Sequence, residues 1–282
     1  MTDRIDSHHH LWKYSELEFG WISEVMQPLR RDFLVSDLTA ELAAAGVQGT
    51  VAVQARQTLD ETRWLLQCAD QCPGIRGVVG WAPLAAPDFE RELEELVTHP
   101  RLKGLRHVLQ DEPDDHFMLG DAFNRGVAAL SGAHLVYDVL IYERHLPVAA
   151  KFVDRHPDQR FVLDHLAKPH IRRQELEPWH ENLRELALRP NVSCKVSGMV
   201  TEADWQRWSI DDLRPYFETA LECFGPERLL AGSDWPVCLL GTSYSRWWQT
   251  LGELVGELST SEQQAILGGN AIRIYGLEDR NG

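Results

Sequence analysis

Short apolar runs alternate with longer helix-patterned stretches along the whole chain. Strands that recur with helices between them predict right-handed parallel crossovers. Eight runs rich in Val, Ile and Leu have the length of buried strands: residues 4–8, 50–54, 76–81, 104–108, 134–139, 160–163, 192–195 and 229–232. Apolar residues recur at helical spacing over 37–45, 60–71, 88–97, 121–130, 146–155, 178–188 and 213–224, and two more helices are expected after Ser243.

The number of strands and the chain length together predict a barrel. Eight βα units in 282 residues fit an α/β fold of the (β/α)8 TIM-barrel type, and no linker divides the chain, so we expect a single domain over 1–282. An open Rossmann-like sheet is the alternative, but it needs a glycine-rich phosphate loop where this chain has histidines. Ser36 and Gly46 are the start and stop residues expected around the helix at 37–45.

Residues 12–33 form a long connection after the first predicted strand, with Trp12, Trp21, Met26 and Pro28 in it. In a barrel this connection lies at the face that holds the carboxyl ends of the strands, where active sites form. Because a loop of this length is commonly a pocket wall or lid, we expect it to border the functional site.

The charge balance argues against a nucleic-acid partner. The chain has 43 acidic and 28 basic residues, a net charge of -15, and no run of Lys and Arg that could follow a phosphate backbone. No segment approaches the length of a membrane span and the first residues lack the apolar stretch of a signal peptide, so we expect a cytoplasmic protein without membrane contact. A homo-oligomer is compatible with the sequence. The cysteines are odd in number and lack zinc-knuckle spacing, which favours free thiols at Cys68, Cys72, Cys194, Cys223 and Cys238.

Polar and ionisable residues follow almost every predicted strand. In a barrel the carboxyl ends of all strands meet at one face, so these side chains should converge. A barrel built only for stability does not need them, and the pattern therefore predicts a binding or catalytic site. The candidates in strand order are His8 and His10, Gln54 and Arg56, Trp81, Arg106 and His107, Asp138 and Tyr142, Asp164 and His165, Lys195 with Ser197 and Gly198, and Ser233 with Asp234.

His8 and His10 are separated by one residue at the end of the first strand. In an extended strand this spacing points both imidazoles to the same side, which can begin a metal site or a polar pocket. His9 should point into the barrel wall or away from the pocket. Three histidines near a terminus can also be a fragment of a purification tag, but this run lies between Asp6 and Leu11 and has only three members, which favours a natural strand end.

Three segments together carry a resemblance to a known family. They are the first-strand His-x-His, Leu-Asp-His-Leu-x-Lys-Pro at 163–169, and Gly-Ser-Asp-Trp-Pro at 232–236. With Gly-Leu-Arg at 104–106 and Lys-x-Ser-Gly at 195–198, they resemble the amidohydrolase superfamily, in the branch of TIM-barrel hydrolases that includes L-fuconolactonases, L-rhamnonolactonases and 2-pyrone-4,6-dicarboxylate lactonases. The resemblance runs from Ile5 to Tyr275 and implies hydrolysis of a sugar-acid lactone, an aldonolactone such as L-fuconolactone, to the open sugar acid.

The resemblance implies that Asp234 is the general base that takes a proton from the hydrolytic water, with His8, His10 and His165 around it. His165 and Arg106 would polarise the lactone carbonyl or hold ring oxygens. The side chains expected to hold substrate hydroxyls or the developing carboxylate are Gln54, Arg56, Trp81, Asp138, Tyr142 and Lys195.

Each of these residues also has a structural interpretation. Asp234 can be a helix N-cap before Pro236, and His165 can be a core histidine with satisfied hydrogen bonds. Arg106 and Lys195 can be ion-paired inside the barrel mouth. A further set of histidines is interpreted as surface or packing residues, namely His107, His116, His134, His145, His156, His170 and His180.

The sequence departs from the superfamily pattern where a metal would bind. Binuclear members carry a bridging Lys or Glu at the end of the fourth strand, where this chain has Arg106, and mononuclear members usually take a fifth-strand His, where this chain reads Val-Tyr-Asp at 136–138. We expect any metal to be a single Zn²⁺, loosely held and dispensable, because a lactone is an activated ester. The ligands that remain for it are His8, His10, Asp234 and His165.

Two other functions stay open at this point. A zinc-dependent decarboxylase of an aromatic or related acid shares the first-strand His-x-His and the eighth-strand Asp, but it depends on a firmer metal site. A catalytically silent barrel that binds a sugar acid as a sensor is the second alternative. Asp234→Asn separates them from a lactonase, which would lose turnover and keep ligand binding.

Overall fold

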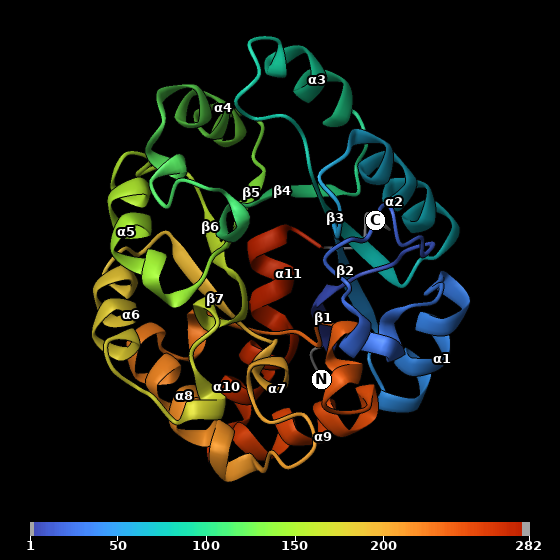
Figure 1. The fold of residues 1–282 in the computed structure, drawn as a ribbon, viewed down its shortest axis with the longest axis vertical. Coiled ribbons are helices and arrows are strands. Elements are labelled where there is room, and N and C mark those ends of the chain that lie inside the picture. Colours follow the sequence, from blue (N-terminus) through green and yellow to red (C-terminus); the bar gives the residue numbers. More distant parts are fainter. Residues whose placement is uncertain (1–2, 278–282) are drawn as a thin grey trace.

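The computed structural model describes residues 3–277 and forms, over this range, one parallel sheet of eight strands. The strands pair in sequence order (Figure 1). The barrel closes where the chain after β8 meets β1, since Asp234 N–H donates to the His8 carbonyl at 2.8 Å and His10 N–H donates to the Trp235 carbonyl at 2.6 Å. The strands are β1 Ile5–His9, β2 Gly49–Val53, β3 Ile75–Gly80, β4 Leu102–Val108, β5 Val136–Leu140, β6 Phe161–Leu163, β7 Val192–Val196 and β8 Leu229–Ala231. The predicted (β/α)8 barrel is confirmed and the Rossmann-like alternative is wrong.

Helices form a ring around the sheet, and α11 lies in the centre of the ring at one end of the barrel (Figure 1). The predicted helices are all present within a few residues. Their bounds are α1 Val35–Ala45, α2 Leu59–Gln71, α3 Phe89–Leu96, α4 Asp121–Gly132, α5 Leu146–Asp154, α6 Trp179–Ala187, α7 Met199–Glu202, α8 Ile210–Phe224, α9 Tyr244–Leu254, α10 Thr260–Gln264 and α11 Asn270–Tyr275. Within residues 3–277 none of the helices has both the length and the apolar character that crossing a membrane requires.

The start predicted for the first helix is wrong. α1 begins at Val35, because the Asp37 carboxylate turns back and accepts a hydrogen bond from the Leu34 N–H at 2.9 Å. Ser36 therefore lies inside the first turn. The stop at Gly46 is confirmed, since this residue adopts the left-handed conformation, with φ +65°, that glycine favours after a helix.

The remaining local differences are small. His134 does not begin β5 but precedes it in a left-handed turn with φ 58°, and Trp81 and Gln54 follow the ends of their strands. The five cysteines are free thiols, as predicted.

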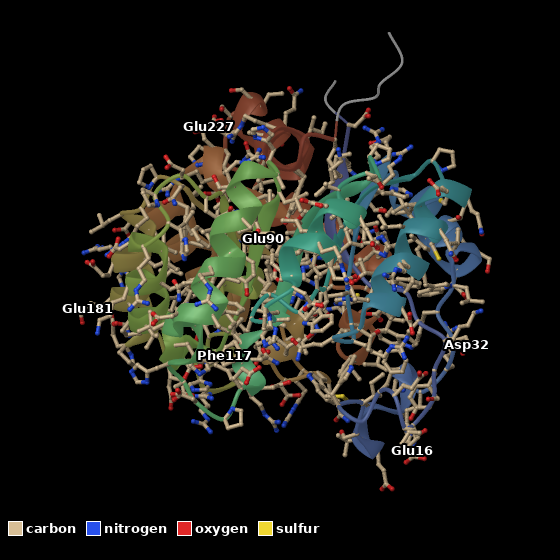
Figure 2. All side chains as sticks on the ribbon, turned by 90° about the horizontal axis from the view of Figure 1, so that it is seen from above. Glu16, Asp32, Glu90, Phe117, Glu181 and Glu227 are labelled. Carbon is tan, nitrogen blue, oxygen red and sulfur yellow. The ribbon has the colours of Figure 1, made fainter. Side chains whose placement is uncertain are left out.

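The long connection 12–33, called the excursion from here on, lies at the face of the barrel that holds the carboxyl ends of the strands. Its two ends are tied together by reciprocal backbone hydrogen bonds between Trp12 and Phe33, at 3.0 and 2.9 Å. In Figure 2 its residue Glu16 projects at the opposite end of the molecule from Glu227, which precedes β8. The excursion is therefore on the side of the barrel where the strand ends converge.

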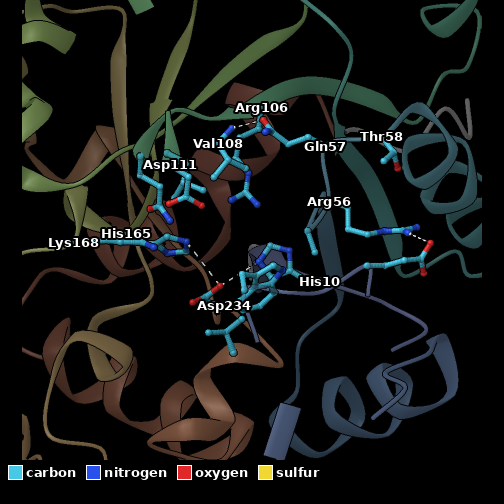
Figure 3. A pocket seen from close by; sticks show the side chains of 16 residues that line it. His10, Arg56, Gln57, Thr58, Arg106, Val108, Asp111, His165, Lys168 and Asp234 are labelled. Atoms are coloured by element: carbon cyan, nitrogen blue, oxygen red, sulfur yellow. Dashed lines mark hydrogen bonds and ion pairs between the residues drawn. The ribbon is translucent and has the colours of Figure 1, made fainter. Parts of the chain in front are cut away.

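The middle of the excursion reaches the end of β2. Glu18 forms an ion pair with Arg56 at 2.5 Å, drawn as a dashed line in Figure 3. Glu18 and Trp21 both line the pocket described below. Residues 12–33 thus supply one wall of the pocket, and their movement as a lid stays a prediction.

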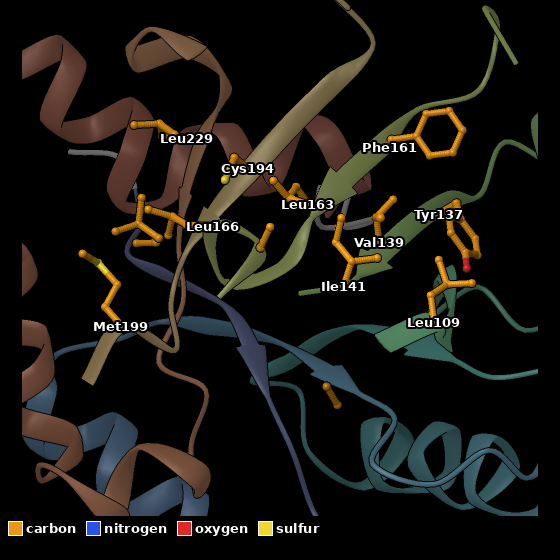
Figure 4. Close-up of a cluster of buried hydrophobic side chains, with 14 of the residues drawn as sticks. Leu109, Tyr137, Val139, Ile141, Phe161, Leu163, Leu166, Cys194, Met199 and Leu229 are labelled. Carbon is orange, nitrogen blue, oxygen red and sulfur yellow. The ribbon is translucent and has the colours of Figure 1, made fainter. Parts of the chain in front are cut away.

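Side chains of the strands belong to two apolar cores, one between the sheet and the helices and one inside the barrel. Along β5, Tyr137 and Val139 join the core between sheet and helices (Figure 4), whereas Val136 joins a second core inside the barrel. Alternation of this kind follows from the two-residue repeat of a strand. The inner core rests on α11 and contains Ile5, Val51, Val53, Val79, Val136, Val162, Leu230, Ala271, Ile274 and Tyr275.

Candidate active site

A pocket of about 510 Å³ opens at the carboxyl ends of the strands, a size that suits a small organic ligand. Figure 3 shows His165 and Lys168 on one side of it, Arg56 on the other, and Asp234 and His10 between them. The predicted site residues that line it are His10, Arg56, Arg106, His165 and Asp234.

Three residues predicted to contact substrate are buried beneath the pocket instead. Gln54, Asp138 and Lys195 are fully buried and absent from the pocket lining. Lys195 and Asp138 can lie beneath the pocket because their charges neutralise each other, with Lys195 Nζ 2.5 Å from Asp138 Oδ2. The Gln54 carbonyl accepts a hydrogen bond from Arg106 Nη2, which makes Gln54 a support for the pocket floor.

Two further predicted contacts lie beside the pocket. Trp81 donates its indole N–H to His107 Nδ1 at 3.3 Å. Tyr142 is half-buried, and its ring centre lies 5.3 Å from Lys168 Nζ. Neither residue is part of the lining.

The two alternating histidines of β1 converge with Asp234. His8 Nε2 and His10 Nε2 are 3.2 Å apart, and Asp234 Oδ1 lies 3.3 Å from His10 Nε2 and 3.8 Å from His8 Nε2. His165 Nε2, from the loop after β6, is also 3.8 Å from Asp234 Oδ1. His9 points away and contacts Thr50 Oγ1 at 3.0 Å, as predicted. All three histidines of the run are buried parts of the barrel, which contradicts a tag remnant.

Hydrogen bonds orient both imidazoles. His10 Nδ1 donates its proton to the Val53 carbonyl at 2.8 Å, so Nε2 is the nitrogen that faces Asp234 and the pocket. His8 Nδ1 lies 3.3 Å from Asp164 Oδ1 and 3.1 Å from Lys195 Nζ. The groups that position the pair, one backbone carbonyl and two side chains, therefore come from three other strands or strand ends.

Burial determines the charge of the histidines. It lowers the pKa of His8 well below its usual value, and it lowers the pKa of His165 to about 4. Burial also opposes ionisation of Asp234, but the imidazoles of His165 and His10 outweigh it, so the pKa of the Asp234 carboxyl lies below its usual value. At neutral pH an ionised Asp234 therefore faces neutral His8 and His165.

A layer of paired charges lies beneath this cluster. Lys195 Nζ lies between Asp138 Oδ2 at 2.5 Å and Asp164 Oδ1 at 3.0 Å, and Arg106 Nη1 lies 2.9 Å from Asp164 Oδ2. The ion-paired interpretation of Arg106 and Lys195 is thus confirmed, and two cations balance two carboxylates. Asp234 has no Lys or Arg ion-pair partner among residues 3–277.

Tyr275 connects this layer to the far end of the barrel. Its hydroxyl, from α11, lies 2.8 Å from Asp138 Oδ1 and 3.0 Å from Oδ2. Sequence reasoning gave no role to Tyr275 or to Asp164. Asp164 was indicated by its position at a strand end and by the motif at 163–169, and nothing near Tyr275 in the sequence indicates its partner.

Left-handed backbone places three pocket residues. His165, Leu166, Ala167 and Lys168 have φ of 52°, 53°, 58° and 53°, and Asp234 has φ 57°. For non-glycine residues this conformation costs roughly 1–2 kcal/mol each, and such strain is common at functional sites. The Asp234 carboxylate does not cap the helix that follows, so the N-cap interpretation is wrong.

Neighbouring residues hold the turn 165–168 in place. Trp179 donates its indole N–H to the Leu166 carbonyl at 2.7 Å, and Ser197 Oγ lies 2.8 Å from His165 Nδ1. A Cβ on Gly198 would lie 2.7 Å from His165 Nδ1, so this close approach requires glycine. The Ser-Gly half of the Lys-x-Ser-Gly motif is thus explained by its contact with His165. Lys168, which the prediction omitted, lines the pocket from the turn that contains His165.

The residues present fit a divalent metal. One ligand atom each from His8, His10 and Asp234 lie within 4.8 Å of one another, and His8, Asp164 and His165 form a second such group. In the first group Nε2 of His10 faces His8 and Asp234, and Asp164 stands beside His8 Nδ1 as an outer partner of the kind that orients metal-binding histidines.

The comparisons with known proteins agree with this architecture. The amidohydrolase family model matches residues 5–277. An L-fucono-1,5-lactonase from Burkholderia multivorans is 43% identical and covers 98% of this chain and 97% of its own. One from Burkholderia ambifaria is 35% identical, over 100% of this chain and 98% of its own. A crystal structure of an amidohydrolase from B. multivorans with bound zinc has a TM-score of 0.92 and 42% identity, covering 98% of this chain and 100% of that one. The chain belongs to the amidohydrolase family.

Proposed function

We propose that this enzyme hydrolyses a sugar-acid lactone, an aldonolactone such as L-fucono-1,5-lactone, to the open sugar acid. The observation that carries the proposal is Asp234, an ionised carboxylate at the floor of the pocket that lies 3.3 Å from His10 and 3.8 Å from His165. The L-fucono-1,5-lactonases at 43% and 35% identity support the substrate class.

In the proposed reaction Asp234 takes a proton from a water molecule as the water oxygen forms a bond to the lactone carbonyl carbon. The ring C–O bond then breaks, and the proton passes from Asp234 to the departing alkoxide, which becomes a hydroxyl of the product. Arg106 and His165, which both line the pocket, polarise the carbonyl or hold ring oxygens. The neutral state of His165 makes it a hydrogen-bonding group and not a fixed charge.

We further propose that one Zn²⁺ can be held by His8, His10 and Asp234, with His165 nearby, and that it is loosely held and dispensable. When bound, such an ion lowers the pKa of water toward neutrality. Arg106 Nη1 lies 3.2 Å from His8 Nε2, so the guanidinium competes with a metal ion for this nitrogen and weakens metal binding. The zinc in the related crystal structure supports the identity of the metal.

Turnover of a panel of 1,4- and 1,5-sugar lactones, followed with a pH indicator, tests the proposed substrate class. The unmodified protein should acidify at least one reaction. Asp234→Asn should reduce kcat by about 10³-fold while the substrate still binds, and Asp60→Asn, which changes an exposed carboxylate on α2, should have no effect. Silence across the panel, with turnover of aromatic carboxylic acids, would favour the decarboxylase.

Chelation tests the metal separately. Activity should persist after dialysis against a chelator, with metal content measured by atomic absorption. Loss of activity on chelation and its return with one equivalent of Zn²⁺ would refute the dispensable metal and leave the lactonase proposal intact.

A further inference from the structure

Three cationic side chains line the pocket in the described part of the chain, namely Arg56, Arg106 and Lys168. Arg106 is held by Asp164 at 2.9 Å and by the Gln54 carbonyl. Its charge is therefore already balanced, and its direction is determined by groups beneath the pocket.

Arg56 is also balanced. It forms an ion pair with Glu18 at 2.5 Å, and its Nε lies 3.7 Å from the buried Glu61 carboxylate. The Glu61 carboxylate in turn accepts the N–H groups of Ala55 and Arg56, at 3.0 and 2.7 Å. This arrangement directs Arg56 toward the excursion and away from Asp234.

Lys168 differs from both arginines. Within residues 3–277 no carboxylate oxygen lies within 4.0 Å of its Nζ, and the ammonium lies 5.3 Å from the centre of the Tyr142 ring. Its charge acts at longer range on the Glu202 and Asp234 carboxyls, where burial raises the pKa and the charge lowers it. Lys168 follows His165 by one left-handed turn, and both side chains lie on the same side of the pocket (Figure 3). Burial opposes ionisation of Asp234, but the Lys168 charge is one of the influences that hold the pKa of the Asp234 carboxyl below its usual value, so its field reaches the floor of the pocket.

We propose that the Lys168 ammonium contacts the lactone carbonyl oxygen and neutralises the negative charge that develops there when water attacks. This inference rests on the proposed lactonase function. The same ammonium then pairs with the carboxylate of the product, because the carbonyl oxygen becomes one of its two oxygens. The left-handed turn 165–168 thereby places a hydrogen-bonding group and a cation on one side of the reacting carbon, opposite the arginine held by Glu18.

The test compares Lys168→Met, Lys168→Arg and the control Lys151→Met, which changes an exposed lysine on α5. L-fucono-1,5-lactone is the substrate and its hydrolysis product is the inhibitor. Removal of one group that stabilises an oxyanion lowers kcat by about 100-fold. We expect this loss for Lys168→Met with KM nearly unchanged, weaker inhibition by the product acid, partial recovery in Lys168→Arg, and no change in Lys151→Met.

Three results would overturn the inference. They are a kcat in Lys168→Met within about twofold of the unmodified protein, an unchanged inhibition constant for the product acid, or an equal loss in Lys168→Arg and Lys168→Met accompanied by a lower unfolding midpoint, which indicates disruption of the turn. Absence of turnover in the unmodified protein would instead refute the proposed function itself.

Discussion

The barrel interior has an apolar part and a charged part, and side chains of the same strands contribute to both. On β5, Val136 packs in the apolar core that rests on α11, while Asp138, two residues nearer the carboxyl end, is paired with Lys195. The first arrangement stabilises the fold by removing apolar surface from water. The second takes charges out of water, which costs free energy that pairing recovers only in part.

The stability of the fold does not explain the charged layer. Lys195, Asp138 and Asp164 are all fully buried, and an apolar filling of the same space would be at least as stable. What the layer does is hold His8, because Asp164 Oδ1 and Lys195 Nζ both lie within 3.3 Å of His8 Nδ1. The apolar core that rests on α11 stabilises the fold, and the charged layer orients the side chains of the pocket.

Lys195→Met tests the charged layer and should have the largest effect on stability. It leaves the Asp138 and Asp164 carboxylates buried without the cation between them, which should lower the free energy of unfolding by about 3–5 kcal/mol. Urea unfolding measures the loss, and Lys151→Met serves as the exposed control. A loss below about 1 kcal/mol would show that the two carboxylates become protonated or hydrated at little cost.

Val136→Ala tests the apolar core at a site on the same strand. It removes two methyl groups from a fully buried side chain and should lower the free energy of unfolding by about 2 kcal/mol. The kcat per folded molecule should stay within about twofold of the unmodified protein. A large loss of kcat in this variant would show that the two parts of the interior do not act separately.

His165→Gln tests the charge of the buried imidazole through the pH dependence of the free energy of unfolding. Because burial lowers the pKa of His165 from 6.5 to about 4, the unfolded chain binds a proton between these pH values that the folded chain does not. Stability from this residue is therefore lost as the pH falls through this range, by roughly 1 kcal/mol per pH unit. Urea unfolding at pH 6 and pH 5 in a chelator should show a steeper decline in the unmodified protein than in His165→Gln, and equal slopes would contradict the neutral assignment.

Glu18→Gln should change the free energy of unfolding least, because the Glu18–Arg56 ion pair lies at the exposed rim of the pocket. The Glu18 side chain is 51% exposed, so the pair should contribute less than about 1 kcal/mol to folding. Thermal unfolding and KM for the lactone measure the change. A destabilisation comparable to that of Lys195→Met would mean that the excursion stabilises the barrel as a whole.

The architecture was predictable because it depends on local patterns. Apolar runs and helical spacing located the strands, and the polar residues after them indicated the end of the barrel that holds the pocket. The sequence did not indicate how deep in the barrel each polar side chain lies. Asp138 and Lys195 were expected in the pocket because both stand at the carboxyl ends of predicted strands, but a position near a strand end does not give the depth of the side chain in the barrel.

The omission of Lys168 has a different cause. Lys168 is part of the motif at 163–169, but the motif does not show where its side chain points, because non-glycine residues rarely adopt left-handed backbone. Contacts from Trp179 and Ser197, together with the space left at Gly198, hold the turn in that conformation. These residues are distant enough in sequence that no local pattern indicates them.

The order of strands and helices, the barrel class and the set of ionisable groups at the open end of the barrel all follow from the amino-acid sequence. Which of these groups neutralise one another, and which face the pocket, depends on the folded arrangement. The reason is that charge pairing depends on distances of 3–4 Å between residues far apart in the chain, such as the 3.3 Å between His10 and Asp234. Those distances are determined by the closure of the barrel between β1 and the segment after β8 and by the left-handed turns at the strand ends.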